Sequence, residues 1–256
     1  MSWSARQYTS FEAERTRPVR DLLNAVPTLT VRRAIDLGCG PGNSTEVLAA
    51  RFPAAEIAGL DTSADMIAAA RKRLPERRFH LGSIVEWDDP GAFDVILANA
   101  VLQWLPDHAT LMPRLAAKLT QGGSLAVQMP DNLQEPAHRL MRQIAAAGPW
   151  AAKLAGAAAV RTSRFTAPWY YTLLRPHAGR VEVWTTIYHH VLAGGTDAVA
   201  EWFKGSGLLP FLEPLEPAET TGFLAEYRAG LADAYPPLAD GSVLLPFPRL
   251  FIVATR

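Results

Sequence analysis

Cysteine is nearly absent from this sequence: Cys39 is the single one among 256 residues. One cysteine excludes an intramolecular disulfide framework and any metal site built from several thiolates. This usage is typical of proteins kept in a reducing compartment, and we expect a cytoplasmic protein.

Net charge is also absent, because 25 basic and 25 acidic side chains cancel. A large excess of positive charge is the usual mark of proteins that bind nucleic acids or anionic membranes. The sequence therefore predicts neither kind of partner. It gives no indication of the oligomeric state.

No window approaches the roughly 18 uninterrupted apolar residues of a membrane span. The first residues, "MSWSARQYTSFEAERTRP", lack the apolar segment of a signal peptide. His189 and His190 are adjacent, so on a strand they would face opposite ways, and the other histidines have no helical partner four residues away. We therefore expect a soluble protein without a metal site.

Hydrophobic residues make up 49% of the chain, enough for the core of one large domain. Four short apolar segments predict strands: "AIDLG", "EIAGLD", "FHLGS" and "FDVILANA". Between the first three lie "STEVLAARF" and "SADMIAAARKRL", rich in helix formers and each opening on a serine suited to an N-cap. Strands alternating with helices predict a parallel sheet covered on both faces.

Further segments extend this pattern. Apolar spacing predicts a helix from Phe11 to Val26, and "HATLMPRLAAKLTQGG" predicts another that is closed by glycine. "SLAVQMP" predicts a fifth strand, and "RVEVWTTIYHHVL" and "PRLFIVATR" predict the last two. Past Pro130 an Ala-rich and then aromatic stretch predicts a cover over the ligand edge of the sheet, and "TDAVAEWFKGSG" and "EPAETTGFLAEYRAGLADAY" predict later helices.

The first predicted strand runs into "AIDLGCGPGNST", which contains Gly38, Gly40 and Gly42. Glycines allow backbone groups to approach a ligand closely, and ligands of open parallel sheets bind beyond the carboxyl ends of the strands. A dinucleotide fingerprint needs G-x-G-x-x-G, but Asn43 stands where its third glycine would be. Asp36 would also repel a pyrophosphate, so the loop favours a ligand with a cationic centre.

Asp61 ends the second predicted strand, nineteen residues after Gly42. A carboxylate at this position can accept hydrogen bonds from both hydroxyls of a ribose. The alternative role, an N-cap for the next helix, is weaker because Thr62 and Ser63 can supply that cap.

These residues resemble the class I S-adenosylmethionine-dependent methyltransferases, whose D-x-G-x-G-x-G loop stands here as "DLGCGPG", Asp36 to Gly42. The resemblance covers about the first 130 residues. It implies a Rossmann-like, doubly wound α/β fold: a mostly parallel seven-stranded sheet with an antiparallel C-terminal strand and a helical cover. It implies S-adenosyl-L-methionine as cofactor, bound by Asp36, Gly38, Cys39, Gly40, Gly42, Asn43, Asp61, Thr62, Met66, Ser83, Ile84 and Asn99.

The resemblance also implies particular contacts within this set. Met66 would lie against the adenine, Ser83 and Ile84 at its edge, and Asn99 beneath the sulfonium. The family often has an aspartate where Ser83 stands, so this position offers the adenine an uncharged hydroxyl instead. Cys39 fits a small loop filler better than a nucleophile, because methyl transfer from a sulfonium needs no covalent intermediate.

Smaller pieces, "YTSFEAERTRP", "LANAVLQWLPDH", "LAVQMPDN" and "FPRLFIVATR", resemble the trans-aconitate 2-methyltransferase family. The resemblance implies esterification of one carboxylate of a small tricarboxylic acid to its monomethyl ester. A carboxylate is already ionised at neutral pH, so no acid or base catalyst is expected, only positioning. Substrate contacts are expected from Tyr8, Arg15, Gln103, Trp104, Met129, Arg164, Trp169 and Tyr170, with arginines pairing the remaining carboxylates.

We expect one methyltransferase domain over residues 1–256. Its parts would be an N-terminal helical lid (1–30), a cofactor-binding core (31–130), a helical and aromatic insertion (131–178) and the final strands and helices (179–256). Another small carboxylic acid is the alternative acceptor. Alternative functions are a nicotinamide-dependent oxidoreductase, a nucleic-acid methyltransferase on the same fold and a non-catalytic module that senses the cofactor.

Overall fold

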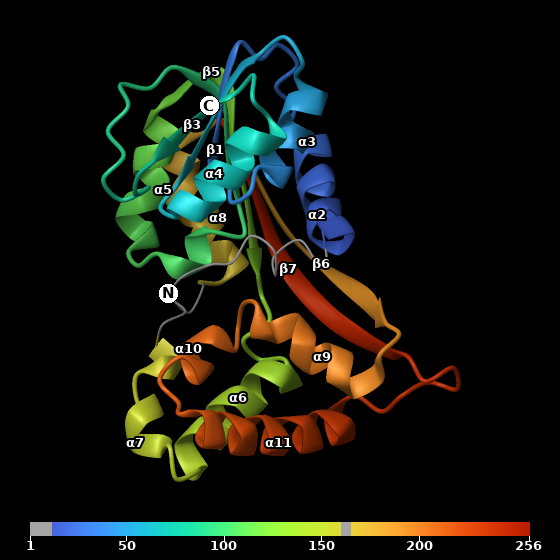
Figure 1. The fold of residues 1–256 in the computed structure, drawn as a ribbon. Helices are drawn as coiled ribbons and strands as arrows, with labels where there is room; N and C mark the ends of the chain where they lie inside the picture. The colour runs from blue at the N-terminus through green and yellow to red at the C-terminus, as the bar shows by residue number, and fades with distance from the viewer. Residues whose placement is uncertain (1–11, 160–164) are drawn as a thin grey trace. The chain divides into compact units, whose positions relative to one another are not determined.

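The computed structural model describes residues 12–159 and 165–256 (Figure 1). The described chain forms two compact units. The sheet unit comprises residues 12–130, 165–186 and 250–256, and the helical unit comprises residues 131–159 and 187–249. In these ranges, no helix is long and apolar enough to cross a bilayer.

The sheet has seven strands in the order β3-β2-β1-β4-β5-β7-β6. The strands are β1 (Arg33–Leu37), β2 (Glu56–Asp61), β3 (Arg78–Leu81), β4 (Phe93–Asn99), β5 (Leu119–Pro130), β6 (Arg180–Leu192) and β7 (Val243–Thr255). The order reverses between β1 and β4, which pair in parallel with Asp36 opposite Leu97. Ligands of doubly wound folds bind at such a reversal, beyond the carboxyl ends of the strands.

The last strand runs against its neighbours. Arg256 exchanges backbone hydrogen bonds of 2.8 and 2.9 Å with Gly122 and Gly123 at the start of β5, whereas Pro248 accepts one from Asp131 just past its end. Residue numbers therefore fall along β7 as they rise along β5, which makes this pair antiparallel. The predicted seven-stranded sheet with its antiparallel C-terminal strand is confirmed.

Helices cover both faces of the sheet unit. They are α2 (Glu12–Asn24), α3 (Asn43–Arg51), α4 (Ala64–Arg73), η2 (Leu102–Trp104), α5 (His108–Ala117), α8 (Ala167–Leu174) and η4 (Arg175–His177). α2 packs on α3 and α5 packs on α8, and Figure 1 shows these two pairs on opposite sides of the sheet. All seven residues of β4 are buried, as expected for a central parallel strand with both faces covered.

Two local predictions were wrong for physical reasons. Ser63 caps α4 as predicted, but the N-cap of α3 is Gly42, and Ser44 lies inside the helix with its hydroxyl on Asp36. The predicted helix over 108–123 ends at Ala117, and its tail begins β5. Residues 119–123 are extended because their backbone pairs with β4 and with Arg256, and this pairing outweighs their helix propensity.

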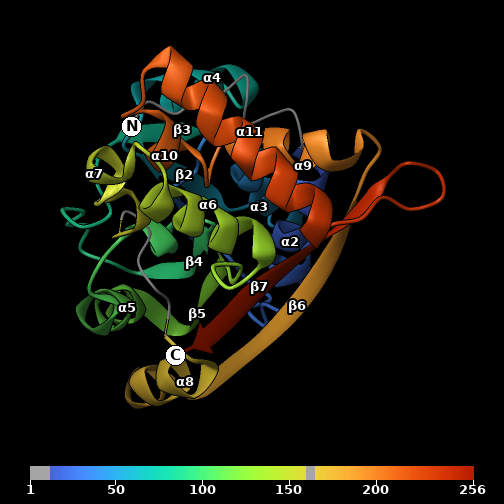
Figure 2. The same ribbon diagram turned by 90° about the horizontal axis from the view of Figure 1, so that it is seen from below.

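The helical unit contains α6 (Pro136–Ala147), α7 (Ala151–Leu154), η3 (Ala157–Ala159), α9 (Gly195–Lys204), α10 (Leu209–Leu212) and α11 (Pro217–Ala234). α11 packs against α6 and α9, and Figure 2 shows it running beside α6. Aromatic rings fill its interior: Phe223 lies 5.5 Å from Trp150 and 6.2 Å from Phe211 between ring centroids. α8 and the first half of β6 belong to the sheet unit instead.

Candidate functional site

The glycine loop lies at the carboxyl end of β1 in left-handed backbone conformations, with φ of 71° at Gly38, 53° at Gly40 and 89° at Gly42. A β-carbon at Gly42 would come within 3.2 Å of the Ala70 Cα on α4, so this glycine is needed for helix packing. Gly40 differs, because no heavy atom of residues 12–159 and 165–256 lies within 4 Å of where its β-carbon would stand. The backbone at Gly40 therefore borders open space that suits a closely approaching ligand.

Asp36 is a fully buried carboxyl at the centre of the sheet. Its Oδ2 accepts hydrogen bonds of 2.7 Å from the hydroxyls of Ser44 and Thr45. Its Oδ1 is buried and has no hydrogen-bond partner within the described chain. Burial raises the pKa of Asp36 to about 6, although the hydroxyls of Thr45 and Ser44 lower it and the charge of Asp61 raises it further.

Asp61 ends β2 and ties the loop to that strand. Its Oδ2 accepts a hydrogen bond of 2.9 Å from the Gly40 N–H, and its Oδ1 accepts one of 2.9 Å from the Ser63 N–H. A carboxylate oxygen has two lone pairs, so each retains one for a further donor such as a ribose hydroxyl. The Gly40 contact also holds the glycine loop close to Asp61, and both are predicted to bind the cofactor.

The chain after β3 is held in place by an arginine. Arg114 on α5 donates hydrogen bonds of 2.6 and 2.8 Å to the carbonyl oxygens of Ile84 and Val85. The Ile84 side chain is buried in the core, and the Ser83 hydroxyl accepts from the Val85 N–H at 3.2 Å. These hydrogen bonds fix the backbone of this turn. Elsewhere in the predicted set, Met66 is buried in α4 and Thr62 is exposed.

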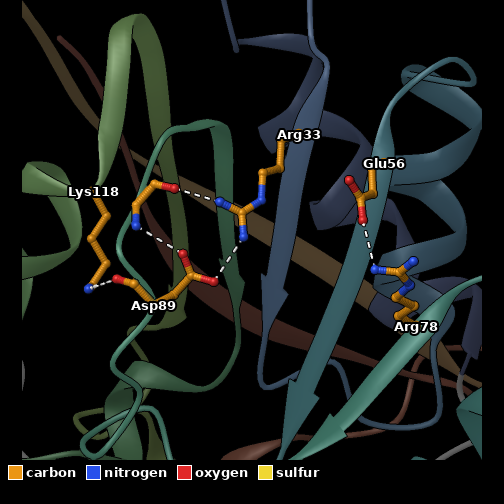
Figure 3. Close-up of polar contacts among 6 residues, drawn as sticks. Arg33, Glu56, Arg78, Asp89 and Lys118 are labelled. Atoms are coloured by element: carbon orange, nitrogen blue, oxygen red, sulfur yellow. Dashed lines mark hydrogen bonds and ion pairs between the residues drawn. The ribbon is translucent and has the colours of Figure 1, made fainter.

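The later part of the connection between β3 and β4, which includes Asp89 and Gly91, is held by polar contacts near the amino ends of the strands (Figure 3). The Arg33 guanidinium donates to Asp89 Oδ2 at 2.9 Å and to the Gly91 carbonyl at 2.5 Å, and the Lys118 ammonium donates to the Asp89 carbonyl. Beside them, Arg78 pairs with Glu56 at 3.2 Å. Arg33, Glu56 and Arg78 each begin a strand, so this cluster lies at the edge opposite the glycine loop.

The chain after β4 turns sharply at the ligand edge. Ala100 has φ of 52°, and its N–H donates to the Gln128 carbonyl at 2.8 Å. Gln103 Nε2 donates to the Ala100 carbonyl at 2.7 Å, which closes the turn. Two oxygens of this segment, Asn99 Oδ1 and Gln103 Oε1, are buried without a hydrogen-bond partner among residues 12–159 and 165–256.

The remaining residues predicted to bind substrate differ in exposure, and some lie outside the described residues. Tyr8 and Arg164 lie outside the described residues, and Arg15 is described only through the backbone of α2. Trp104 and Trp169 are partly exposed, and the Trp169 ring stacks on Phe165 at 3.8 Å between centroids. Met129, in contrast, is fully buried in the core.

Tyr170 is also fully buried, and its hydroxyl is 2.7 Å from His108 Nδ1. The other ring nitrogen, Nε2, is 2.8 Å from the Leu102 carbonyl oxygen. Because a carbonyl only accepts, Nε2 carries the proton, and in the neutral ring Nδ1 accepts from Tyr170. The Tyr170 hydroxyl is thus used inside the protein, which argues against a direct contact with substrate.

Comparison with known proteins gives a consistent result. A family model described as a methyltransferase domain matches residues 35–125. A trans-aconitate 2-methyltransferase of Methylobacterium radiotolerans is 55% identical, with 99% of this chain and 98% of the relative covered. The chain belongs to the trans-aconitate 2-methyltransferase family. Another member, from Paracidovorax citrulli, is 52% identical over 99% of this chain and 98% of its own length.

Solved structures agree with this fold. The YcgJ protein from Bacillus subtilis matches with a TM-score of 0.60 and 12% identity, covering 94% of this methyltransferase and 98% of that chain. Phosphoethanolamine N-methyltransferase 2 of Haemonchus contortus, in complex with S-adenosyl-L-methionine, matches with a TM-score of 0.55 and 17% identity over 93% of this chain and 52% of that one. At such identities the likeness supports the fold alone.

S-adenosyl-L-methionine is the cofactor of this methyltransferase, and the residues present fit it. The open side of Gly40 suits a ligand in close contact with backbone. Asp36 Oδ1, which has no partner in the part of the chain that the structure describes, suits a cation or a hydrogen-bond donor. Cys39 is buried, and burial together with the charges of Asp36 and Asp61 raises the pKa of its thiol. It is thus a loop filler without nucleophilic character.

Sequence reasoning missed the partners of these residues. Ser44 and Thr45 were assigned to a helix start, although hydroxyls in the first helical turn after a glycine loop are well placed to hydrogen-bond a buried acid in the preceding strand. The histidines were considered only as metal ligands and rejected in that role, so the hydrogen bonds of His108 to Tyr170 and Leu102 were not expected. The role of His108 depends on Tyr170, 62 residues away, and no local pattern marks that contact.

Proposed function

We propose that this methyltransferase transfers a methyl group from S-adenosyl-L-methionine to one carboxylate of trans-aconitate, giving the monomethyl ester and S-adenosylhomocysteine. Full-length relatives that carry the name trans-aconitate 2-methyltransferase, at up to 55% identity, support this acceptor. The family favours this function over the oxidoreductase, the nucleic-acid methyltransferase and the non-catalytic module.

The structural observation that carries the cofactor part of the proposal is Asp36 Oδ1, buried and without a partner among the described residues, beside a glycine loop in which the described residues leave space at Gly40. We assign Asp36 to the ammonium group of the cofactor, Gly38 to Gly42 to its methionine part and Asp61 to its ribose. Ser83, Ile84 and Met66 are assigned to the adenine. When bound, S-adenosyl-L-methionine supplies a methyl group on a positively charged sulfur, and that bond breaks as the acceptor oxygen bonds to carbon.

The protein needs no general base for this reaction, because the acceptor carboxylate is ionised at neutral pH. Its tasks are to hold the carboxylate oxygen in line with the methyl group, to exclude water and to pair the other two carboxylates. Arg15 and Arg164 are proposed for the pairing, because a guanidinium can bind a carboxylate through two hydrogen bonds. Tyr8, Trp104 and Trp169 are proposed to line the acceptor.

A panel of acids tests the acceptor. The enzyme is incubated with methyl-labelled S-adenosyl-L-methionine and, separately, with trans-aconitate, cis-aconitate, citrate, isocitrate and monocarboxylates, and the products are read by mass spectrometry. We expect one labelled methyl group on trans-aconitate. Methylation of monocarboxylates alone would contradict the proposal, and a melting temperature raised by NADH but not by S-adenosylhomocysteine would favour an oxidoreductase.

The ribose assignment has its own test. Asp61→Ala should weaken binding of S-adenosyl-L-methionine in calorimetry by about tenfold or more, since it removes an ionised acceptor of two hydroxyls. Asp65→Ala is the matched control, because Asp65 is exposed on the next helix. Equal affinity of Asp61→Ala and the wild type would show that the ribose binds elsewhere.

A further inference from the structure

Gln103 is a buried amide with a fixed orientation. Its side chain is only 4% exposed, and Nε2 donates to the Ala100 carbonyl at 2.7 Å. Because a carbonyl oxygen cannot donate, the NH2 group must face Ala100 and the amide oxygen must point away from it. That oxygen, Oε1, has no hydrogen-bond partner in the described part of the chain.

The turn that carries Gln103 is braced from several directions. The Trp104 N–H donates to the Val101 carbonyl at 3.1 Å, and the Leu105 N–H donates to the Leu102 carbonyl at 3.0 Å. His108 Nε2 binds the same Leu102 carbonyl at 2.8 Å, which ties η2 to α5. Gln103 is therefore part of a rigid turn and keeps Oε1 in one direction.

Two more oxygens of the same kind lie on the neighbouring strand ends. Asp36 Oδ1 on β1 and Asn99 Oδ1 at the end of β4 are buried and without a donor among the described residues. β1 and β4 pair in parallel with Asp36 opposite Leu97, two residues before Asn99. All three oxygens thus belong to the carboxyl ends of two adjacent strands or to the turn that directly follows.

The chemistry of these oxygens selects their ligand. A carboxylate acceptor offers only oxygens that accept hydrogen bonds, and it would be repelled by an amide oxygen held toward it. A cation or a donor group would be stabilised there, because buried polar oxygens without partners are costly. The orientation of Gln103 therefore conflicts with the prediction that this residue binds the substrate acid.

We propose that Gln103 Oε1 faces the positively charged methyl-sulfonium part of bound S-adenosyl-L-methionine, so that Gln103 recognises the methyl donor and not the acceptor acid. This inference rests on the proposed function only in taking S-adenosyl-L-methionine as the donor. An amide oxygen at that position stabilises the charged donor more than S-adenosylhomocysteine, whose sulfur is neutral. Gln103 then favours exchange of the product for fresh donor after each turnover.

Calorimetry without any acceptor tests this role. Gln103→Met keeps the length and approximate volume of the side chain and removes the amide. We expect its Kd to rise about tenfold for S-adenosyl-L-methionine and for sinefungin, which has an amino group in place of the sulfonium methyl. For S-adenosylhomocysteine we expect less than about a threefold rise. Gln143→Met is the control, because Gln143 is exposed on α6.

Two outcomes would overturn the inference. An equal loss of affinity for all three ligands would indicate a structural role in the turn. An unchanged Kd for all three, together with a raised KM for trans-aconitate, would return Gln103 to the acceptor. If Gln103→Met does not fold, Gln103→Asn retracts the amide by one methylene and is expected to change the affinities in the same direction. Wild-type enzyme that binds the donor but methylates no acid of the panel would contradict the proposed function alone.

Discussion

The side chain of Val101 occupies the space that a β-carbon on Gly38 would need. An ideal Cβ there would lie 2.3 Å from Val101 Cγ2, closer than any real contact. Gly38 follows β1 and Val101 follows β4, so this contact joins the ends of the two strands between which the sheet order reverses. Gly38 is thus required for packing within the protein, whereas Gly40 borders space that no other described residue fills.

The two glycines should therefore respond differently to alanine. Gly40→Ala should fold, with a loss of about 1–2 kcal/mol from its left-handed backbone, and should bind S-adenosylhomocysteine much more weakly because the methyl group enters the ligand space. Gly38→Ala adds the clash with Val101, so its melting temperature should fall further, and Gly38→Ala with Val101→Ala should recover part of it. Equal melting temperatures for the two single variants would refute this distinction.

Asp36 should make stability depend on pH in an unusual direction. Its folded pKa of about 6 lies above its ordinary value of 3.8, so the folded protein holds this proton more tightly than the unfolded chain. The free energy of unfolding should fall as pH rises from about 4 to about 6, by an amount on the order of 2–3 kcal/mol. Asp36→Asn should lack this fall when ligand-free protein is unfolded in denaturant across that range. If the wild type and Asp36→Asn showed the same dependence of unfolding free energy on pH, the raised pKa of Asp36 would be contradicted.

The same carboxyl should control cofactor affinity. A positively charged ligand favours the ionised form of Asp36, so the Kd of S-adenosyl-L-methionine should decrease as pH rises through about 6. In Asp36→Asn the Kd should be higher at pH 7 and should change little from pH 5 to pH 8. Calorimetry across this range measures both effects, and an equal pH dependence in the variant would assign the titration to another group.

Asp94 should show the opposite sign. Burial alone would raise the pKa of Asp94, but hydrogen bonds from the Arg32 N–H, the Thr120 hydroxyl and the Arg33 N–H outweigh it and lower the pKa. Its contribution to stability is therefore present above about pH 4 and is lost as pH falls below that value. Asp94→Asn should cost about 1–2 kcal/mol at pH 7, and the difference should shrink in acid. Asp88→Asn, at an exposed position of the same connection, should have little effect.

Tyr170→Phe tests whether this residue serves the fold or the substrate. Removing the hydroxyl leaves buried His108 Nδ1 without its donor, which should cost about 1–3 kcal/mol of unfolding free energy. The KM for trans-aconitate should stay within about threefold of the wild type. Tyr171→Phe, with an exposed ring on the same helix, is the control. A raised KM at unchanged stability would place the Tyr170 hydroxyl in the acceptor site.

Much of the fold could be predicted from the sequence because its signals are local. "EIAGLD" and "RVEVWTTIYHHVL" coincide with β2 and β6, and the serine before α4 caps it. The start of β5 could not be predicted, because residues 119–123 are extended only through partners on β4 and at Arg256. α8 groups with the sheet unit, and this too depends on contacts between residues far apart in the sequence, such as those of α8 with α5.

The site was predictable to a different extent. The glycine spacing and Asp36 indicated the chemical nature of the ligand, because backbone access and charge follow directly from residue type. The direction of the Gln103 amide could not be predicted, since it is set by the Ala100 carbonyl just before the short 3-10 helix η2. The burial of Met129 and Tyr170 also depends on how the core closes around them.

The place of β7 in the sheet has a consequence for synthesis on the ribosome. β7 is made after the other six strands, yet it lies between β5 and β6 and not at an edge. Until residues 243–255 have emerged from the ribosome, the edge of β5 that faces away from β4 has no partner strand. β6 likewise has no strand to pair with, because its neighbour in the sheet is β7. Unpaired strand edges readily pair with other chains, so translation that stalls before residue 243 should leave a product that depends on chaperones.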